Sequence, residues 1–274
     1  MKDLSKYYEV NRKKWNELAE IHYKGDGYNV KSFIENRSGL YSLEIGEVGD
    51  VRNKSLLHLQ CHFGKDTLSW NLRGAESVVG VDFSEKAISF ATELANKMKL
   101  DAKFIHCNIY DLKDHLDEKF DIVYCSYGAI PWLHDLKTWA ELISSYLKPG
   151  GFFYIVDAHP TAFIFDNDPN GDIAVKYSYF KKKEPIKFEE DGSYADADAK
   201  LKNLTEYSWN YSVSEIINLL IKAGLQIEFF NEHIEVPWKL YDMLEKKEGD
   251  WWTFPKEWVG REFPLLFSLK ATKI

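Results

Sequence analysis

The stretch from Leu56 to Asp82 constrains the fold of this chain more than any other part of the sequence. It consists of an apolar run, a turn that contains Gly64, a helix-like segment and a second apolar run that ends in an acid. Strand, turn, helix and strand in this order form the first half of a nucleotide-binding α/β unit. The chain is therefore expected to fold around a sheet whose first turn binds a ligand.

The same alternation of strands and helices continues beyond this stretch. The pattern predicts strands at 55–59, 77–81, 103–106, 121–125 and 151–157, and helices at 65–73, 84–97 and 139–147. Apolar strands without an alternation of polar residues indicate a parallel sheet that is covered on both faces. Right-handed crossovers then give a doubly wound α/β fold.

Segments on either side of this core follow other patterns. Helices are predicted near 6–22 and at 30–42, and strands at 177–188 and 200–211 are expected to pair as a hairpin-like lid. Core strands return at 225–230 and 264–270, after a helix that begins with a capping box at Ser212 and Glu215. The expected organisation is a single domain with an N-terminal helical cap (1–49), a core (50–157 and 212–274) and an insertion (158–211).

Composition and charge exclude several classes of protein. A chain of 274 residues that is 45% hydrophobic can bury a full core. The net charge of −8 and the scattered basic residues argue against a nucleic-acid partner. Cys61, Cys107 and Cys125 stand far apart, so neither a disulfide framework nor a metal site is expected. Neither a membrane span nor an apolar signal segment is visible, which predicts a cytoplasmic protein without a membrane partner.

The turn after the first strand restricts the class of ligand. A dinucleotide pyrophosphate requires three spaced glycines there, because the phosphates contact the backbone and rest on the helix N-terminus. Only Gly64 is a glycine, and Gln60 and His62 occupy the other two positions. NAD and FAD are therefore disfavoured, whereas a ligand with an adenosine but no phosphate makes a weaker demand on the turn.

Leu56 to Asp66 resembles the first motif of the class I S-adenosylmethionine-dependent methyltransferases. Residues 79–84, 104–112, 120–127 and 147–157 are similar to the later motifs of that family in order and spacing, and a weaker similarity recurs at 207–230 and 263–273. The resemblance implies a Rossmann-like, seven-stranded sheet with an antiparallel last strand, and S-adenosylmethionine as the cofactor. Family members usually carry an acid where His58 stands and glycines where Gln60 and His62 stand. The sequence His-Leu-Gln-Cys-His-Phe-Gly at 58–64 therefore looks like a variant of the first motif.

The resemblance also implies a cofactor site at the carboxyl edge of the sheet. Asp82 would accept both ribose hydroxyls, and Phe83 would pack on the adenine. Asn108 would accept a hydrogen bond from the adenine amino group, unless it is only a turn residue. The residues expected to bind the cofactor are Tyr28, Gln60, Cys61, His62, Gly64, Asp82, Phe83, Ser84, Asn108, Ile109, Tyr110, Ser126 and Tyr127.

The implied function is methyl transfer to a small-molecule acceptor by direct displacement, in a monomer or homodimer. A base is needed only if the acceptor is protonated, and His134 is the candidate because its ordinary pKa is near neutral. A helix-cap or surface role is the alternative for His134. Trp15, Tyr23 and Tyr28 would either close over the methionine end of the cofactor or form a hydrophobic cluster. The alternative functions are a cofactor-binding or regulatory protein without transfer chemistry and a nicotinamide oxidoreductase.

Overall fold

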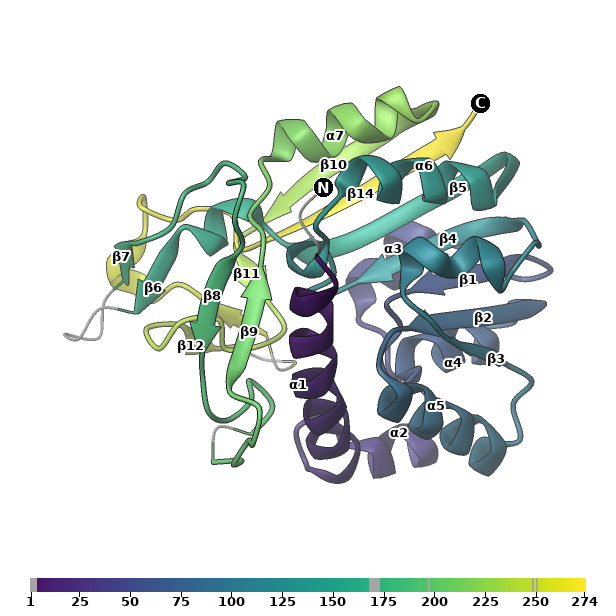
Figure 1. Ribbon diagram of the computed structural model, residues 1–274, viewed down its shortest axis with the longest axis horizontal. Helices are drawn as coiled ribbons and strands as arrows, with labels where there is room; N and C mark the ends of the chain where they lie inside the picture. Colours follow the sequence, from purple (N-terminus) through teal and green to yellow (C-terminus); the bar gives the residue numbers. More distant parts are fainter. Residues whose placement is uncertain (1–3, 168–172, 197, 248, 250) are drawn as a thin grey trace.

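The computed structural model describes residues 4–167, 173–196, 198–247, 249 and 251–274, and it is built around a seven-stranded sheet (Figure 1). The strand order is β10-β14-β5-β4-β1-β2-β3. The strands are β1 (Ser55–Leu59), β2 (Ser77–Asp82), β3 (Lys103–His106), β4 (Phe120–Ser126), β5 (Leu147–Ala158), β10 (Leu225–His233) and β14 (Leu266–Lys273). β14 runs antiparallel to both of its neighbours, and the remaining pairs are parallel. The predicted fold class is therefore confirmed.

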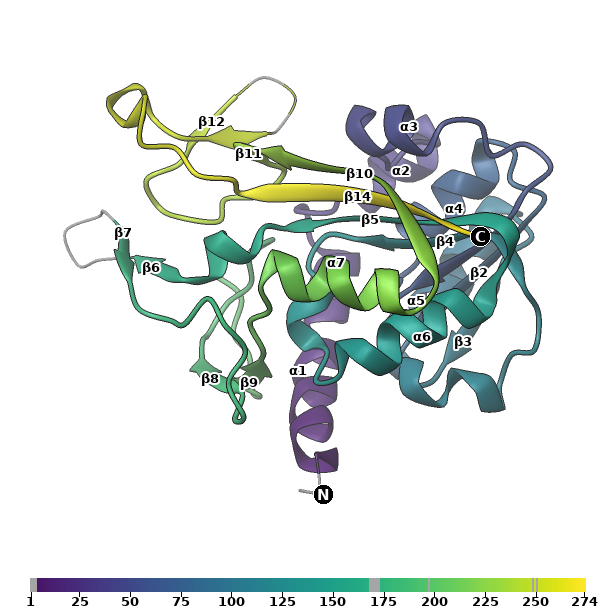
Figure 2. The ribbon, with the colours of Figure 1, turned by 90° about the horizontal axis from the view of Figure 1, so that it is seen from above.

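Helices cover both faces of this sheet, because its strands are apolar on both sides. α6 (Leu136–Tyr146) and α7 (Val213–Lys222) pack on one face, and α3 (Ser42–Val48) and α4 (Lys65–Leu72) pack on the other (Figure 2). α5 (Glu85–Met98) packs beside α4 and α2 (Val30–Asn36). The hydroxyl of Ser84 caps α5 by accepting a hydrogen bond from the N–H of Ala87 at 3.1 Å, as predicted for this helix start.

Several predicted boundaries differ from the structure, and three of the differences have a clear cause in the backbone or in a cap. The helix predicted at 30–42 is two helices, because α2 ends where Arg37 takes a left-handed φ of 55° and α3 begins only at Ser42. α6 begins at Leu136, before the predicted start, because the side chain of Asp135 accepts hydrogen bonds from the first helical N–H groups. β5 begins at Leu147, and Gly150 lies within it at a φ of 77°.

Two excursions extend from the carboxyl end of the sheet. Between β5 and α7 the chain forms two short hairpins, β6–β7 (Phe165–Asn167 with Ile173–Val175) and β8–β9 (Ile186–Glu189 with Thr205–Ser208). The predicted hairpin is thus present but shorter, and its polar 189–198 segment includes residue 197, which is outside the described residues. Between β10 and β14 lies a three-stranded sheet that was not predicted, formed by β11 (Glu235–Val236), β12 (Glu245–Lys246) and β13 (Trp252–Thr253). Short 3₁₀ helices occur at η1 (Ile109–Asp114), η2 (Ile130–Trp132), η3 (Pro160–Phe163) and η5 (Lys256–Trp258).

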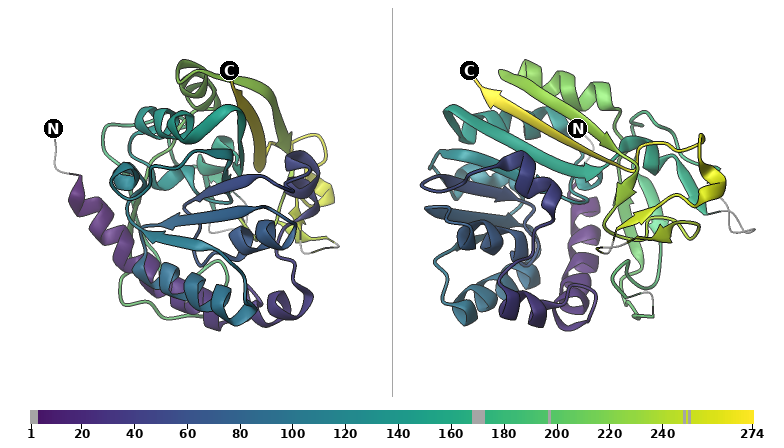
Figure 3. Two further views of the ribbon diagram at one scale, coloured as in Figure 1. Left: turned by 90° about the vertical axis from the view of Figure 1, so that its right-hand side faces the viewer. Right: turned by 180° about the vertical axis from the view of Figure 1, so that it is seen from behind.

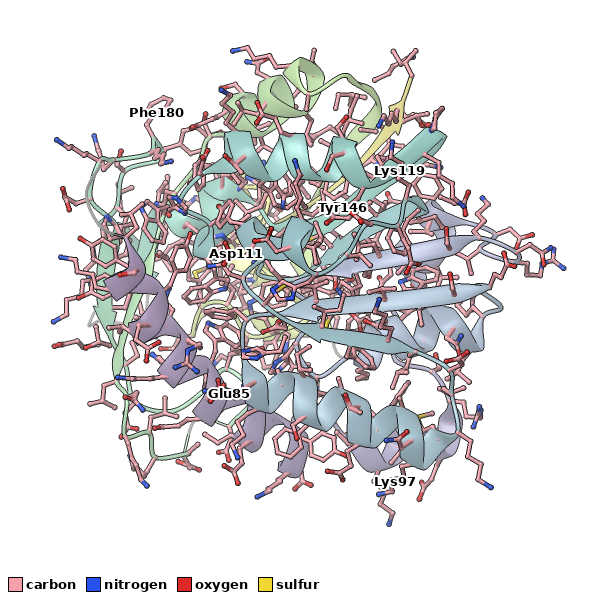
Figure 4. All side chains as sticks on the ribbon, turned by 45° about the vertical axis from the view of Figure 1, so that its right-hand side comes forward. Glu85, Lys97, Asp111, Lys119, Tyr146 and Phe180 are labelled. Carbon is pink, nitrogen blue, oxygen red and sulfur yellow. The ribbon has the colours of Figure 1, made fainter. Side chains whose placement is uncertain are left out.

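The helix α1 (Ser5–Lys24) stands between the sheet and the β8–β9 hairpin (Figures 1 and 3). Toward the hairpin, the Asn11 side chain donates to the Tyr207 carbonyl and accepts from the Tyr207 N–H, both at 2.8 Å. Toward the core, Arg12 pairs with Glu85, which lies beside α1 at the start of α5 (Figure 4). α1 therefore covers the carboxyl edge of the sheet. Among the described residues, no helix has the length and the apolar composition needed to cross a membrane.

Candidate functional site

The turn between β1 and α4 keeps a glycine-like backbone although two of its residues have large side chains. Gln60, His62 and Gly64 have φ angles of 56°, 51° and 75°. The left-handed conformation costs a residue with a Cβ about 1–2 kcal/mol, so neighbouring groups must hold the turn. The N–H of Cys61 donates to a carbonyl of β2 at 2.9 Å, and the N–H of His62 donates to Asp82 Oδ2 at 2.8 Å. The turn therefore follows the path that glycines would take.

Two members of the expected cofactor set are packing groups in this turn. A Cβ added to Gly64 would lie 2.6 Å from the ring of Phe104, so the glycine is required by packing as well as by its φ angle. The side chain of Cys61 is buried against Gly80 of β2, where an added Cβ would lie 2.8 Å from Sγ. Burial raises the pKa of the Cys61 thiol, so the thiol stays protonated and unreactive.

Asp82, at the end of β2, is the best-defined polar group at this edge. Its side chain is 7% exposed and accepts hydrogen bonds from the N–H of His62 at 2.8 Å and the N–H of Ser84 at 2.9 Å. Burial raises its pKa to about 6, although these hydrogen bonds favour the charged form. Each carboxylate oxygen has a second lone pair, so Asp82 can still accept hydrogen bonds from a diol.

The residues that follow Asp82 connect the core to α1. Ser84 Oγ donates to Asn16 Oδ1 at 2.7 Å. Phe83 is partly exposed, and its carbonyl accepts from His106 Nε2 at 3.1 Å. A ligand bound to Asp82 would therefore lie beneath α1.

The end of β3 contributes mainly structural groups. Asn108 begins η1, with its Oδ1 accepting a hydrogen bond from the N–H of Tyr110 at 3.2 Å. Ile109 is buried in the core, and the Tyr110 hydroxyl donates to the carbonyl of Asp135 at 3.0 Å. Asn108 thus has the turn role that was the alternative, and its contact with adenine stays a prediction.

The end of β4 carries a polar network that includes residues outside the predicted set. Ser126 Oγ donates to Asp66 Oδ2 at 2.9 Å and lies 3.3 Å from His58 Nε2. His58 Nδ1 lies 2.8 Å from Thr67 Oγ1, and burial lowers the pKa of His58 to about 3. His58 is therefore neutral, and Asp66 is the acidic group of this network.

Tyr127 points toward α3. Its hydroxyl donates to Glu44 Oε2 at 2.8 Å, and the side chain of Glu44 is fully buried. Burial, followed by the charge of Asp66, raises the pKa of Glu44 to about 7. Sequence reasoning missed Glu44 because nothing in the helix around it distinguishes it from a solvated acid.

The loop after Tyr127 is held by the buried Asp157, which the sequence placed only at a strand end. Its carboxylate accepts hydrogen bonds from the N–H groups of Gly128 at 2.5 Å, Ala129 at 3.0 Å and Ile130 at 2.9 Å. The side chain of Gln60 donates from Nε2 to the Ala129 carbonyl at 2.9 Å. The loops after β1, β4 and β5 therefore form one connected edge.

Aromatic side chains of α1 and the following loop lie over the turn. The Trp15 ring centroid is 5.2 Å from that of Trp132 and 5.6 Å from that of His62. His22, which was not predicted, stacks on Tyr28 at 4.9 Å and places Nδ1 2.9 Å from His62 Nε2. Tyr23 stacks instead on Phe90 of α5 at 4.3 Å, so it belongs to a hydrophobic cluster.

His134 lies at the same edge, near the start of α1. Its Nδ1 is hydrogen-bonded to the Tyr8 hydroxyl, its ring centroid is 4.8 Å from that of Tyr110, and its carbonyl accepts from Lys181 Nζ at 2.5 Å. Burial lowers the pKa of His134, which keeps the ring neutral at physiological pH. A neutral ring can accept a proton, and the role of His134 as a base stays a prediction.

Two buried polar atoms beside the turn have no hydrogen-bond partner within the described part of the chain. They are Gln60 Oε1, an acceptor, and Trp15 Nε1, a donor. Each such atom costs about 1–3 kcal/mol when it stays unpaired. An adenosine ligand with an amino-acid end has a diol for Asp82 and both donors and acceptors for these atoms, so the residues fit the expected cofactor. The described residues bring no three His, Cys, Asp or Glu side chains together in a way that would hold a metal ion.

Comparisons with known proteins concern part of the sequence and the fold. Residues 56–151 match the family model of the methyltransferase domain. An mRNA cap guanine-N(7) methyltransferase of Caenorhabditis elegans is 29% identical over 140 residues, which are 45% of this chain and 37% of that protein. A candidate protein N5-glutamine methyltransferase of Methanocaldococcus jannaschii is 30% identical over 99 residues, which are 36% of this chain and 46% of that protein. The chain thus spans less than half the length of these curated relatives.

The fold is shared over a larger part of the chain. An S-adenosylmethionine-dependent methyltransferase structure from Mesorhizobium loti superposes with a TM-score of 0.58 at 19% identity, covering 89% of this chain and 100% of the other. Its likeness concerns the fold, whereas the family match covers the residues that carry the first motifs. Residues 56–151 therefore carry a methyltransferase domain, as the resemblance implied, and the chain has the fold that S-adenosylmethionine-dependent methyltransferases share.

Proposed function

We propose that this protein transfers a methyl group from S-adenosylmethionine to a small-molecule acceptor by direct displacement. The observation that carries the proposal is the cover over the carboxyl edge of the sheet. α1 lies across the loops after β1, β2 and β4 through Trp15, Asn16 and Arg12, and the β8–β9 hairpin lies behind it. An acceptor that reaches this edge must fit beneath the cover, which favours a small molecule.

The task of the protein in this reaction is positioning. Asp82 holds the ribose, and the turn from Gln60 to Gly64 holds the amino-acid end. The bound cofactor supplies an electrophilic methyl group on a positively charged sulfur. The rings of Trp15 and Trp132 exclude water from this region, and aromatic faces suit a cation. Alignment of donor and acceptor accounts for most of the rate, and His134 accepts a proton if the acceptor carries one.

An open hollow between the start of α3 and the end of β10 favours a small acceptor without phosphate groups. It has a volume of about 630 Å³, within the range of small-molecule sites. Its lining contains Glu232 and Glu235 but neither Lys nor Arg, and the whole chain has a net charge of −8. The relatives named above act on an mRNA cap and on protein glutamine, as their names state. RNA needs a concentrated positive surface, so the charge favours a small molecule here.

Calorimetry with S-adenosylmethionine and S-adenosylhomocysteine tests the cofactor site. Both are expected to bind below millimolar concentration, and binding of neither at millimolar concentration would contradict the proposal. Asp82→Ala should weaken binding at least tenfold, because it removes the acceptor of the ribose hydroxyls. The exposed Asp111, at the same edge but outside the site, gives a matched control as Asp111→Ala (Figure 4).

A protein that binds the cofactor without transferring its methyl group is the second candidate. It is favoured by the side chains of Gln60 and His62, which stand where the family usually has glycines. The two candidates differ in turnover. Release of S-adenosylhomocysteine on incubation with a pooled small-molecule extract supports transfer, and release only with RNA or protein fractions would shift the acceptor class. Binding without release in all three fractions would favour the second candidate.

A further inference from the structure

Asp66 lies in the first turn of α4, and its carboxylate is held from one side. Oδ2 accepts a hydrogen bond from Ser126 Oγ at 2.9 Å, and His58 and Thr67 continue the network behind that hydroxyl. Within the described residues, no hydrogen bond reaches the second oxygen, Oδ1. The network therefore fixes the direction of the carboxylate and leaves one of its oxygens for a ligand.

The surroundings of Asp66 are negative. Burial raises the pKa of Asp66, and the charge of Asp66 contributes to the raised pKa of Glu44. Among the described residues, no Lys or Arg is bonded to either carboxylate. The neighbouring Lys65 opposes the shift of Asp66, but its Nζ donates to the Tyr28 carbonyl at 3.3 Å. A bound cation would offset this repulsion.

One further buried oxygen, Gln60 Oε1, lacks a hydrogen-bond partner within the described part of the chain. Gln60 and Asp66 are both bonded to the loop after β4, the first through Ala129 and the second through Ser126. A buried polar atom without a partner indicates a missing group, and here a donor would satisfy Gln60 Oε1.

We propose that Asp66 binds the ammonium group at the amino-acid end of S-adenosylmethionine, with Gln60 Oε1 as a second acceptor. An ammonium group has three N–H donors and no acceptor, which matches oxygens that lack donors. Because His58 is neutral, Asp66 is the acidic group on this side of the turn, and a bound ammonium group would favour its charged form. The inference rests on the proposed function, since it takes this cofactor as the ligand.

Calorimetry with two matched ligands tests this assignment. One is S-adenosylhomocysteine, and the other is its desamino analogue, which carries a hydrogen in place of the amino group. The wild-type protein is expected to bind S-adenosylhomocysteine about 10- to 100-fold more tightly than the analogue. Asp66→Asn should remove most of this preference while changing the affinity for the analogue by less than about threefold. A preference that survives in Asp66→Asn, or an equal loss of affinity for both ligands, overturns the proposal.

A second variant keeps the test decisive if Asp66→Asn does not fold. Ser126→Ala retains the charge of Asp66 but removes the hydrogen bond that holds it, so the preference should fall about three- to tenfold; an unchanged preference contradicts the proposal. Asp82→Asn should weaken both ligands equally. A wild-type protein that binds both ligands equally overturns this inference alone, whereas one that binds neither overturns the proposed function as well.

Discussion

Gly64 combines a backbone requirement and a packing requirement in one residue. Gly64→Ala would place a Cβ at a φ of 75° and 2.6 Å from the Phe104 ring. The backbone strain and the overpacking together should lower the free energy of unfolding by about 3 kcal/mol. Gly150→Ala is the matched control, because Gly150 has a φ of 77° but open space around its Cα; its cost should be about 1 kcal/mol. Urea unfolding measures both values, and equal costs would contradict the packing argument.

The buried Glu44 makes stability depend on pH. Its pKa is raised to about 7 in the folded protein, so the folded state holds a proton that the unfolded state has released above its ordinary pKa. The protein should therefore lose stability as pH rises through the window between the ordinary pKa and about 7. The side chain of Glu44→Gln cannot titrate, so this variant does not lose stability in the window. The free energy of unfolding of the variant minus that of wild type should therefore be about 2–3 kcal/mol larger above the window than below it. Chemical unfolding at both pH values checks this, and a constant difference would show that Glu44 does not titrate there.

At the scale of elements, buried polar contacts tie α1 to the β8–β9 hairpin. The side chain of Asn11 is 1% exposed and makes hydrogen bonds with both the N–H and the carbonyl of Tyr207, as a neighbouring strand would. The buried Lys14 forms an ion pair with Glu206 at 2.8 Å. Asn11→Ala should lower the free energy of unfolding by about 2–4 kcal/mol, because two backbone groups lose their partner. Arg12→Ala removes a partly exposed pair on the other face of α1 and should cost less than about 1 kcal/mol.

Hydrogen exchange locates the effect of these two substitutions. In Asn11→Ala, faster exchange is expected in both α1 and β9, since the two elements lose their shared hydrogen bonds. Faster exchange confined to α1 would show that the hairpin is stable without it. Arg12→Ala should leave β9 unchanged.

The elements of the core were predictable because their signals are local. The apolar run of β1 is interrupted only by His58, that of β2 only by Gly80, and Ser84 marks the start of α5, so their bounds follow from neighbouring residues. The break at Arg37 depends on a left-handed residue that no neighbouring Gly or Pro announces. The β11–β13 sheet was missed because strands of two residues carry no periodic pattern.

The residues of the candidate site divide in a similar way, into those that could be predicted and those that could not. Asp82 and the Gln60–Gly64 turn follow strands, so their place at the carboxyl edge was predictable from the alternation of elements. Glu44 and Asp66 lie within helices, and they join the edge only through tertiary contacts with Tyr127 and Ser126. Sequence patterns identify the strand ends of such a site, whereas groups from packed helices require the folded structure.

At the scale of the whole molecule, the cover over the sheet edge predicts how the cofactor enters. Trp15 and His22 of α1 contact the turn directly, so the helix must move before a ligand can pass between them and Gln60. Binding is then limited by opening, and its observed rate should reach a plateau as ligand concentration rises. The contact between Trp15 and Trp132, with ring centroids 5.2 Å apart, provides a fluorescence signal for stopped-flow measurements with S-adenosylhomocysteine.

The contact between α1 and the β8–β9 hairpin provides a matched variant for this experiment, because the hairpin holds α1 against the edge of the sheet. Asn11→Ala loosens that attachment without altering a group that faces the turn, so the plateau rate should rise about tenfold or more if the lost hydrogen bonds oppose opening. Arg12→Ala should raise it less, because its pair with Glu85 is partly exposed. A rate that increases linearly with ligand in all three proteins would mean that the cofactor reaches the edge without movement of α1.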